Sequence, residues 1–246
     1  RRQRQMCIRD RYYDGGVLMI KREIIDSTIL LHDLNDRDKE FLSENLEIQK
    51  FKRGDYIFHH MDEANFMYIM KSGAMKISMD LSDGREQILY IYRKEDFVGG
   101  LNLLTADKYV YNGIALTESE VIKISKQIYN DLLIHNENFL REMLIQSFLR
   151  IRKSEELIDR LCVINGDMKV AKGLIDLVHM SGKREPDGSF LISPHMNRTE
   201  LGSYTGLARE TVTRKLSYFE DMGYIELLPK GAIRILDMDS LRDLTI

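Results

Sequence analysis

Residues 197–217 constrain the fold more than any other stretch of this 246-residue chain. Asn197 and Thr199 are residue types that begin helices, because their side chains can accept hydrogen bonds from free backbone N–H groups. Gly206 can take the positive φ that a sharp turn requires. Apolar residues on both sides of that turn have the spacing that packs two short helices together: Leu201, Leu207, Val212 and Leu216. The pattern predicts a helix-turn-helix.

The second helix of this motif, expected at about residues 207–222, has a polar face opposite its apolar one. That face presents Arg209, Glu210, Thr213 and Arg214. A guanidinium can donate to both O6 and N7 of guanine, and a carboxylate can accept from N4 of cytosine. A helix with such groups near its N-terminal end suits the DNA major groove. The alternative for Glu210 is a solvated residue paired with Arg214 one turn later.

Charge and composition limit the other classes of function. The formal net charge of −3 excludes a uniformly basic protein, but a local positive patch is enough to bind DNA. The two cysteines, Cys7 and Cys162, have no paired spacing, which favours a reducing, cytoplasmic environment. No apolar run approaches the roughly 18 residues of a membrane span, so we expect no membrane partner.

Residues 1–18 are set apart from the fold. Their sequence, including Met6–Asp10, is similar to the translation of a sequencing adapter, and the alternative is a natural basic arm that contacts DNA or stays disordered. Met19 is the native start expected under the first interpretation.

Residues 19–125 are expected to form one domain, with a helical lead-in over residues 21–46 and short strands from Ile48 onward. Apolar and aromatic runs alternate there with turn signals, and Ser82–Arg85 has the composition of a hairpin tip. Closely spaced strands of this kind predict a small antiparallel barrel or sandwich.

Residues 126–165 contain no Gly or Pro and change to a helical period. Steps of four and three define an apolar seam over three heptads: Leu140, Leu144, Ser147, Ile151, Ser154, Ile158 and Leu161. Such a seam predicts a coiled-coil contact between two chains, with the two serines weakening the contact but able to fix its register. The alternative is a single helix packed on its own barrel. Asn165–Asp167 is expected to break the helix.

Residues 166–246 combine the helix-turn-helix with strands. A helix is expected over 170–180, a turn over 185–188 and a short strand over 190–192. Apolar runs at 224–228 and 232–236 flank Pro229–Gly231 and predict a hairpin. This unit is therefore predicted to be a winged helix-turn-helix.

This order of elements resembles the Crp/Fnr family of bacterial transcription regulators over residues 25–240. The resemblance is most specific at Glu200–Gly202, Gly206–Leu207 and Arg209–Arg214, and looser at Met67–Gly73 and Asp96–Gly99. It implies an α+β fold in three parts. An N-terminal antiparallel β-barrel or jelly roll of the cyclic-nucleotide-binding type is followed by a long dimerisation helix and a C-terminal winged helix-turn-helix.

The resemblance also implies roles for single residues. Arg209, Glu210 and Arg214 would contact base edges, and Thr213 stands where some members place a small hydroxyl that contacts a base. Residues that would contact phosphates, and so set register rather than sequence preference, are Arg198, Thr199 and Thr211. The implied assembly is a homodimer on an inverted repeat in double-stranded DNA, with a TGA-like core in each half-site and RNA polymerase as a further partner.

The effector is not identified by the sequence. Where cyclic-AMP-binding members carry a Gly-Glu pair, this chain has Gly99–Gly100, and the Lys108–Tyr111 stretch lacks the arginine that pairs with the phosphate. These departures argue against cyclic AMP. Two cysteines cannot supply the four thiolates of an iron–sulfur cluster. Haem stays open, because one histidine could suffice and several lie in this half: His32, His59, His60 and His135.

Two rival functions have less support in the sequence. The sequence shows no phosphate-binding glycine loop, no paired metal-ligand spacing and no nucleophile motif, so we expect no enzyme activity. The alternative function is a small-molecule-binding regulatory module without specific DNA binding. Arg209, Glu210 and Arg214 argue against it, because contacts between proteins do not require that set.

Overall fold

The computed structural model describes residues 19, 21–162, 165–193 and 196–245. The chain forms two compact units, and each gathers segments that are separate in sequence. The first comprises the chain up to Met75 together with Tyr92–Arg150, and the second comprises Lys76–Ile91 together with the chain from Ile151 onward. Residues 1–18, expected to be an adapter-derived fragment, lie outside the described residues.

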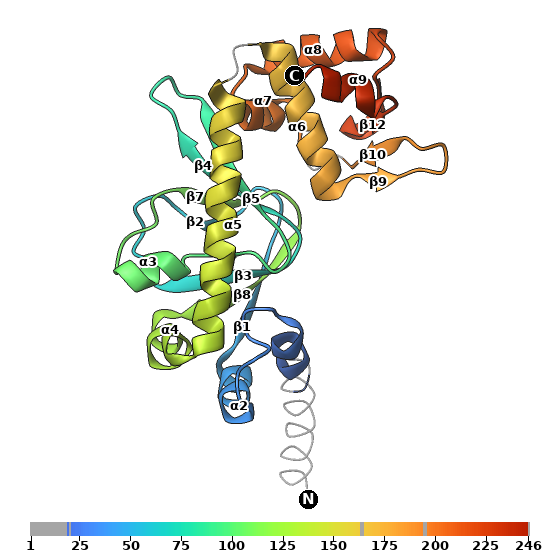
Figure 1. The fold of residues 1–246 in the computed structure, drawn as a ribbon. Coiled ribbons are helices and arrows are strands. Elements are labelled where there is room, and N and C mark those ends of the chain that lie inside the picture. The colour runs from blue at the N-terminus through green and yellow to red at the C-terminus, as the bar shows by residue number, and fades with distance from the viewer. Residues whose placement is uncertain (1–18, 20, 163–164, 194–195, 246) are drawn as a thin grey trace, which may run out of the picture. The chain divides into compact units, whose positions relative to one another are not determined.

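Short strands between residues 47 and 125 form two four-stranded sheets (Figure 1). One sheet has the order β1-β8-β3-β6, with the bounds β1 (Glu47–Phe51), β8 (Ser119–Ser125), β3 (Phe66–Ser72) and β6 (Phe97–Val98). The other has the order β2-β7-β4-β5, with the bounds β2 (Tyr56–Phe58), β7 (Asn112–Ala115), β4 (Met75–Asp80) and β5 (Glu86–Tyr92).

The register of the first sheet centres on β8, which pairs antiparallel with β1 on one side and β3 on the other. Ile122 lies opposite both Ile48 and Ile69, and it is almost completely buried. Gly84, with φ of 81°, lies in the tip between β4 and β5, as the turn signal predicted. The strand-rich region expected from the sequence is therefore confirmed.

Aromatic rings from both sheets meet in the core of the first unit. Phe58 of β2 stacks on Tyr68 of β3 with ring centroids 5.8 Å apart, and Tyr109 stacks on Phe58 at 4.2 Å. The predicted α+β fold class is confirmed, with a sandwich as its N-terminal part. In the part of the chain that the structure describes, both sheets stay open and do not close into a barrel. The domain limits 19–125, 126–165 and 166–246 stay predictions.

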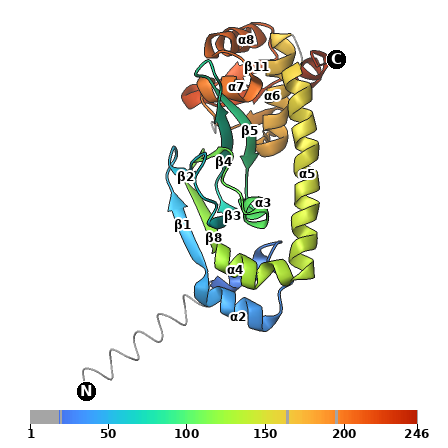
Figure 2. The ribbon, with the colours of Figure 1, turned by 90° about the vertical axis from the view of Figure 1, so that its left-hand side faces the viewer.

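Helices complete the first unit, and α2 and α4 lie at the same end of its sheets (Figures 1 and 2). The region predicted as helical from residue 126 is divided into pieces: α4 (Lys126–Asp131), the 3-10 turn η1 (Leu133–His135) and α5 (Glu137–Cys162). Asn136 supplies the break, because its side chain accepts from Phe139 N at 2.9 Å and so caps α5. Helices α2 (Asp36–Asn45) and α3 (Gly100–Thr105) also belong to this unit.

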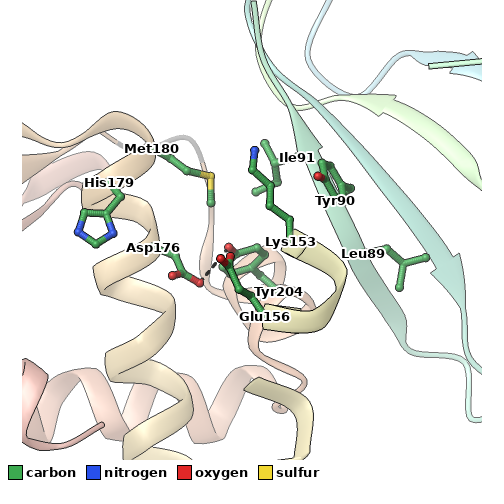
Figure 3. A pocket seen from close by; sticks show the side chains of 9 residues that line it. All are labelled: Leu89, Tyr90, Ile91, Lys153, Glu156, Asp176, His179, Met180 and Tyr204. Atoms are coloured by element: carbon green, nitrogen blue, oxygen red, sulfur yellow. Dashed lines mark hydrogen bonds between the residues drawn. The ribbon is translucent and has the colours of Figure 1, made fainter. Parts of the chain in front are cut away.

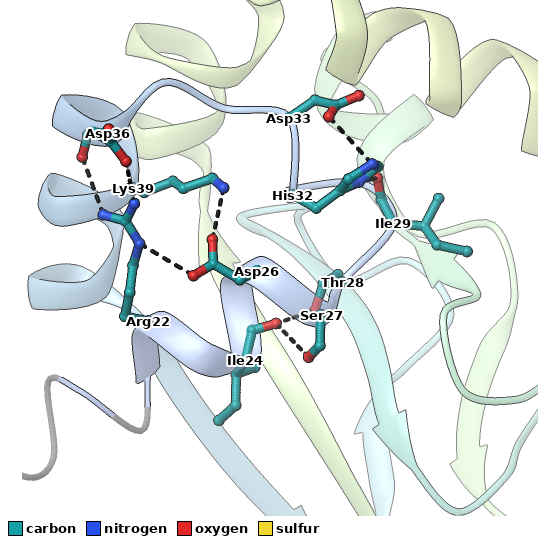
Figure 4. A network of polar contacts seen from close by, with 10 residues as sticks. All are labelled: Arg22, Ile24, Asp26, Ser27, Thr28, Ile29, His32, Asp33, Asp36 and Lys39. Carbon is teal, nitrogen blue, oxygen red and sulfur yellow. Dashed lines mark hydrogen bonds and ion pairs between the residues drawn. The ribbon is translucent and has the colours of Figure 1, made fainter.

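A polar network joins α2 to the helical residues 21–27 that precede it (Figure 4). Asp26 accepts from Lys39 Nζ at 2.6 Å, and Arg22 contacts both Asp26 and Asp36. The hydrogen bond from Lys39, aided by the charges of Lys39 and Arg22, lowers the pKa of Asp26. These pairs bridge two helices that are separated by the eight residues 28–35.

The second unit contains the predicted winged helix-turn-helix. Its small sheet has the order β11-β12-β10-β9, and Gly223, with φ of 74°, follows α8. The bounds are α6 (Gly166–Ser181), β9 (Lys183–Arg184), β10 (Phe190–Ile192), α7 (Arg198–Thr205), α8 (Arg209–Asp221), β11 (Ile225–Leu227), η2 (Pro229–Gly231), β12 (Ile233–Ile235) and α9 (Met238–Asp243). Asn165 caps α6 through Asp167 N, so the predicted helix break at this point is confirmed.

Candidate nucleic-acid interface

The first helix of the motif, α7, begins with a complete capping box. The Asn197 side chain accepts from the backbone N–H groups of Thr199 and Glu200 at 2.9 Å each. In return, the Glu200 carboxylate accepts from Asn197 N at 2.7 Å. These bonds satisfy N–H groups that a helix start leaves open, which fixes where α7 begins.

Two glycines shape the turn between α7 and α8. Gly206 has φ of 70°, the left-handed conformation that the sequence predicted there. Gly202 is needed for a different reason, because a Cβ at this position would lie 2.6 Å from Leu207 O. The backbone of the turn therefore packs directly onto α7, and this close approach sets the angle between the helices.

The second helix, α8, separates a buried face from an exposed face. Val212, Leu216 and Phe219 are completely buried. All four side chains expected to contact base edges are exposed: Arg209, Glu210, Thr213 and Arg214. The Thr213 hydroxyl donates to Arg209 O at 2.9 Å, so its oxygen is still able to accept. The roles of these four residues stay predictions, but their placement meets the geometric requirement for them.

Contacts to α6 hold the helix pair in place. Lys215 of α8 forms an ion pair with Asp167 of α6, with Nζ 2.8 Å from Oδ1. Gly173 of α6 leaves room for α7, since a Cβ there would lie 2.8 Å from the Thr205 methyl group. The exposed face of α8 is thus presented by a helix that is anchored on its other side.

The three residues expected to contact phosphates differ in environment. Thr199 is exposed, whereas Arg198 and Thr211 are half-buried. Burial lowers the pKa of the Arg198 guanidinium, and the nearby Glu220 partly opposes this. A guanidinium stays protonated at neutral pH despite such a shift. Thr199 and Arg209 line the same open cleft of about 540 Å³, together with Arg85 and Lys169.

Comparisons with known proteins match both halves of the chain. Residues 48–136 match the cyclic nucleotide-binding domain, and residues 168–244 match the Crp-like helix-turn-helix domain. The chain belongs to the Crp/Fnr family.

Relatives within the Crp/Fnr family are similar along most of their length. The anaerobic regulatory protein of Bacillus subtilis is 28% identical over 218 residues, which cover 88% of this chain and 90% of that protein. The cAMP-activated global transcriptional regulator CRP of Escherichia coli O157:H7 is 26% identical, covering 77% and 90%. The solved structure of FixK2 from Bradyrhizobium japonicum aligns with a TM-score of 0.71 at 20% identity, covering 82% and 98%. The chain is thus a transcriptional regulator of the Crp/Fnr type.

The position that holds ribose in cyclic-AMP-binding Crp/Fnr members is sterically restricted in this chain. Gly100 begins α3, and a Cβ there would lie 3.2 Å from Met67 Sδ and 3.3 Å from the Phe97 ring. A glutamate at this position would have to displace both neighbours. The sequence identified the missing carboxylate, and the structure adds the packing that leaves little room for one.

The stretch that lacks the phosphate-pairing arginine places a tyrosine in the core instead. Tyr109 is buried, and its hydroxyl donates to Phe66 O at 2.6 Å while its ring stacks on Phe58. Burial raises the pKa of the Tyr109 phenol. Phe58, Tyr68 and Tyr109 therefore form a buried aromatic cluster inside the N-terminal sandwich.

The seam predicted on α5 forms part of a wide exposed apolar surface. Leu144 is 71% exposed, and Leu140, Ile151 and Ile158 are also exposed. Of the remaining seam residues, Ser147 is half-buried, Ser154 is exposed, and the side chain of Leu161 lies outside the described residues. The heptad pattern missed three further exposed residues of this helix: Ile145, Phe148 and Leu149. A broader stripe of i, i+3 and i+4 neighbours would have included them.

The described residues were also compared with the requirements of a metal site and of a membrane span. Among the described residues, no group of three or more His, Cys, Asp or Glu side chains is placed to hold a metal ion. Within the same part of the chain, no helix combines the length and the apolar character needed to cross a membrane. Cys162 is the last residue of α5, and its side chain lies outside the described residues.

Proposed function

We propose that this Crp/Fnr chain is a homodimeric, sequence-specific transcription regulator that binds an inverted repeat in double-stranded DNA. The observation that carries the proposal is the division of α8 into two faces. Its apolar side chains are buried, whereas Arg209, Glu210, Thr213 and Arg214 are exposed on the other side. These groups match donor and acceptor patterns that base pairs present in the major groove.

The phosphate contacts are assigned to Arg198, Thr199 and Thr211, which lie at the starts of the two helices. Such contacts fix the register of the protein on the duplex without reading sequence. Most of the affinity is then electrostatic and falls steeply as salt is raised.

The homodimer is assigned to α5, because exposed leucine and isoleucine side chains recur along this helix. A two-fold axis along such a helix pair relates two recognition helices, so half-sites separated by about one DNA turn are expected. We also propose that the protein acts in the cytoplasm, with RNA polymerase as a second partner. Relatives that are named as regulators support this proposal.

A binding series on spaced duplexes tests the function. Fluorescence anisotropy with inverted repeats of a TGA-like half-site, at several spacings and salt concentrations, should identify one spacing with strong and salt-sensitive binding. Equal affinity for every duplex, random sequence included, would reject specific DNA binding. Such a result would favour the alternative of a regulatory module that only binds a small molecule.

A further inference from the structure

A cavity of about 190 Å³ lies in the second unit, and it is lined by none of the residues assigned to DNA (Figure 3). Its walls come from four elements: β5 supplies Leu89, Tyr90 and Ile91, α5 supplies Lys153 and Glu156, α6 supplies Asp176, His179 and Met180, and α7 supplies Tyr204. The space corresponds to about six water molecules at roughly 30 Å³ each. It is therefore large enough for a small organic molecule.

Hydrogen bonds hold these walls together. The buried side chain of Gln87 on β5 donates from Nε2 to Ser203 O of α7 at 2.7 Å. The buried Tyr204 of α7 donates from its hydroxyl to Asp176 Oδ2 of α6 at 3.3 Å. One hydrogen bond thus joins β5 to α7, and another joins α7 to α6.

The charges that line the cavity favour a cation. Glu156 and Asp176 contribute two carboxylates against the single amine of Lys153, so acidic side chains outnumber lysine in the lining. The two carboxylates lie on the side of Tyr204, whereas the Lys153 amine points toward Tyr90 and Ile91 (Figure 3). Lys153 Nζ lies 5.6 Å from the centroid of the Tyr90 ring.

We propose that this cavity binds a small organic amine with an apolar body. The ammonium group would lie between Glu156 and Asp176, because charge-assisted hydrogen bonds to carboxylates are the strong ones. The apolar body would lie against Leu89, Ile91 and Met180. As part of the proposed function, such a ligand contacts α7 directly and is placed to bias the helix-turn-helix through its differential affinity for two arrangements.

Calorimetric titration of the full-length chain with phenethylamine, without DNA, tests the site. Two compounds of similar shape serve as controls: 3-phenylpropan-1-ol, which is neutral, and 3-phenylpropionate, which is negative. We expect saturable binding of the amine at one site per chain, affinity at least about tenfold weaker for the alcohol, and no binding of the acid. The absence of saturable amine binding, or equal binding of amine and alcohol, would overturn the proposal.

Variants locate the binding. Glu156→Gln and Asp176→Asn should each weaken amine binding about tenfold, since each removes one charged acceptor. Glu155→Gln makes the same change on the neighbouring residue, which does not line the cavity, and should leave the affinity unchanged. Filling the cavity with Leu89→Trp should abolish binding. An amine affinity that E155Q reduces as much as E156Q would overturn the assignment. Because binding is measured without DNA, its failure is distinct from a failure of the proposed DNA function.

Discussion

At the scale of single residues, Arg214 is the side chain whose removal most directly tests base contact. It is exposed on α8, five residues after Arg209. We predict that Arg214→Ala costs about 1–3 kcal/mol of discrimination at one guanine, because a bidentate contact to O6 and N7 is lost. The measurement is the ratio of affinities for the operator and for random DNA.

Arg242→Ala is the matched control for that experiment. Arg242 is also exposed in the second unit, where it pairs with Asp239 on α9. Its loss removes the same charge but should leave the affinity ratio unchanged. An unaltered ratio in the Arg214 variant would contradict its assignment to a base edge.

Arg198 is predicted to act on affinity rather than on specificity. Its guanidinium is half-buried at the start of α7, where a phosphate contact would position the motif. Arg198→Ala should weaken binding to all sequences alike and reduce the slope of log affinity against log salt by about 1. Titrations at several salt concentrations measure that slope. A change that depends on the bases of the half-site would show instead that Arg198 contributes to sequence preference.

The glycines show what single residues reveal before a structure is known. The positive φ of Gly206 could be predicted from its place between two helical patterns. The need for Gly202 and Gly100 could not, because each is required by an atom that tertiary packing brings near. Leu207 O approaches Gly202, and Met67 Sδ approaches Gly100. The local sequence can therefore predict that a glycine adopts a positive φ. It cannot predict which atom, brought near by the tertiary fold, excludes a side chain at a glycine.

At the scale of elements, α5 carries the prediction for assembly. Leu144→Glu places a charge on the most exposed apolar side chain among the described residues of the seam, and in a dimer two such charges would meet. We expect the dimer to dissociate to monomers at concentrations where the wild type stays dimeric, as measured by sedimentation velocity. Ile29→Glu changes an exposed apolar residue away from α5 and should leave the mass unchanged. A dimer that is unaffected by Leu144→Glu would place the contact elsewhere.

The same helix shows why a sequence pattern can find a helix and still underestimate how many of its apolar side chains are exposed. Steps of four and three identified Leu140, Leu144, Ile151 and Ile158, all of which are exposed. The strict heptad excluded Phe148 and its apolar neighbours, although they enlarge the uncovered stripe. Whether an apolar side chain of α5 is covered depends on strands distant in sequence, so periodicity alone cannot decide it.

The polar network between α2 and the helix before it makes stability depend on pH. The pKa of Asp26 is lowered in the folded state, chiefly by the hydrogen bond from Lys39. Its contribution is therefore present above the unfolded pKa of about 3.9 and is lost as pH falls through the lower folded pKa. Since the Asp26 side chain is 48% exposed, Asp26→Asn should cost less than about 1 kcal/mol at pH 7.

Urea unfolding at pH 7 and at pH 3 measures this effect. The difference in the free energy of unfolding between wild type and Asp26→Asn should shrink at the lower pH. Glu23→Gln makes the same charge change on an exposed residue of the same helix and should show a smaller difference at pH 7. A difference for Asp26→Asn that is independent of pH would indicate a packing defect rather than the loss of the ion pair.

At the scale of the whole molecule, neither compact unit is one continuous segment of the sequence. The hairpin of β4 and β5 lies among strands in the sequence, yet most of it belongs to the unit that contains the helix-turn-helix. Gln87 shows why this could not be predicted. Its amide reaches a backbone carbonyl 116 residues away, and no local pattern signals such a contact. The fold class followed from the order of elements, whereas the cavity beside this hairpin depends on pairings of distant segments.

The N-terminal sandwich differs at two places from the cyclic-AMP-binding members of the family. Together these differences predict how the whole regulator responds to cyclic AMP. A bound ligand stabilises a protein according to its concentration relative to Kd. Here Gly100 replaces the ribose-holding carboxylate, and the buried Tyr109 lies in the stretch that lacks the phosphate-pairing arginine. We therefore expect millimolar cyclic AMP to change neither the melting temperature nor the affinity for operator DNA. A dose-dependent rise in melting temperature would show that the aromatic core can open and accommodate a nucleotide. An unchanged melting temperature, together with strong operator binding, would mean that the DNA-binding arrangement forms without this ligand.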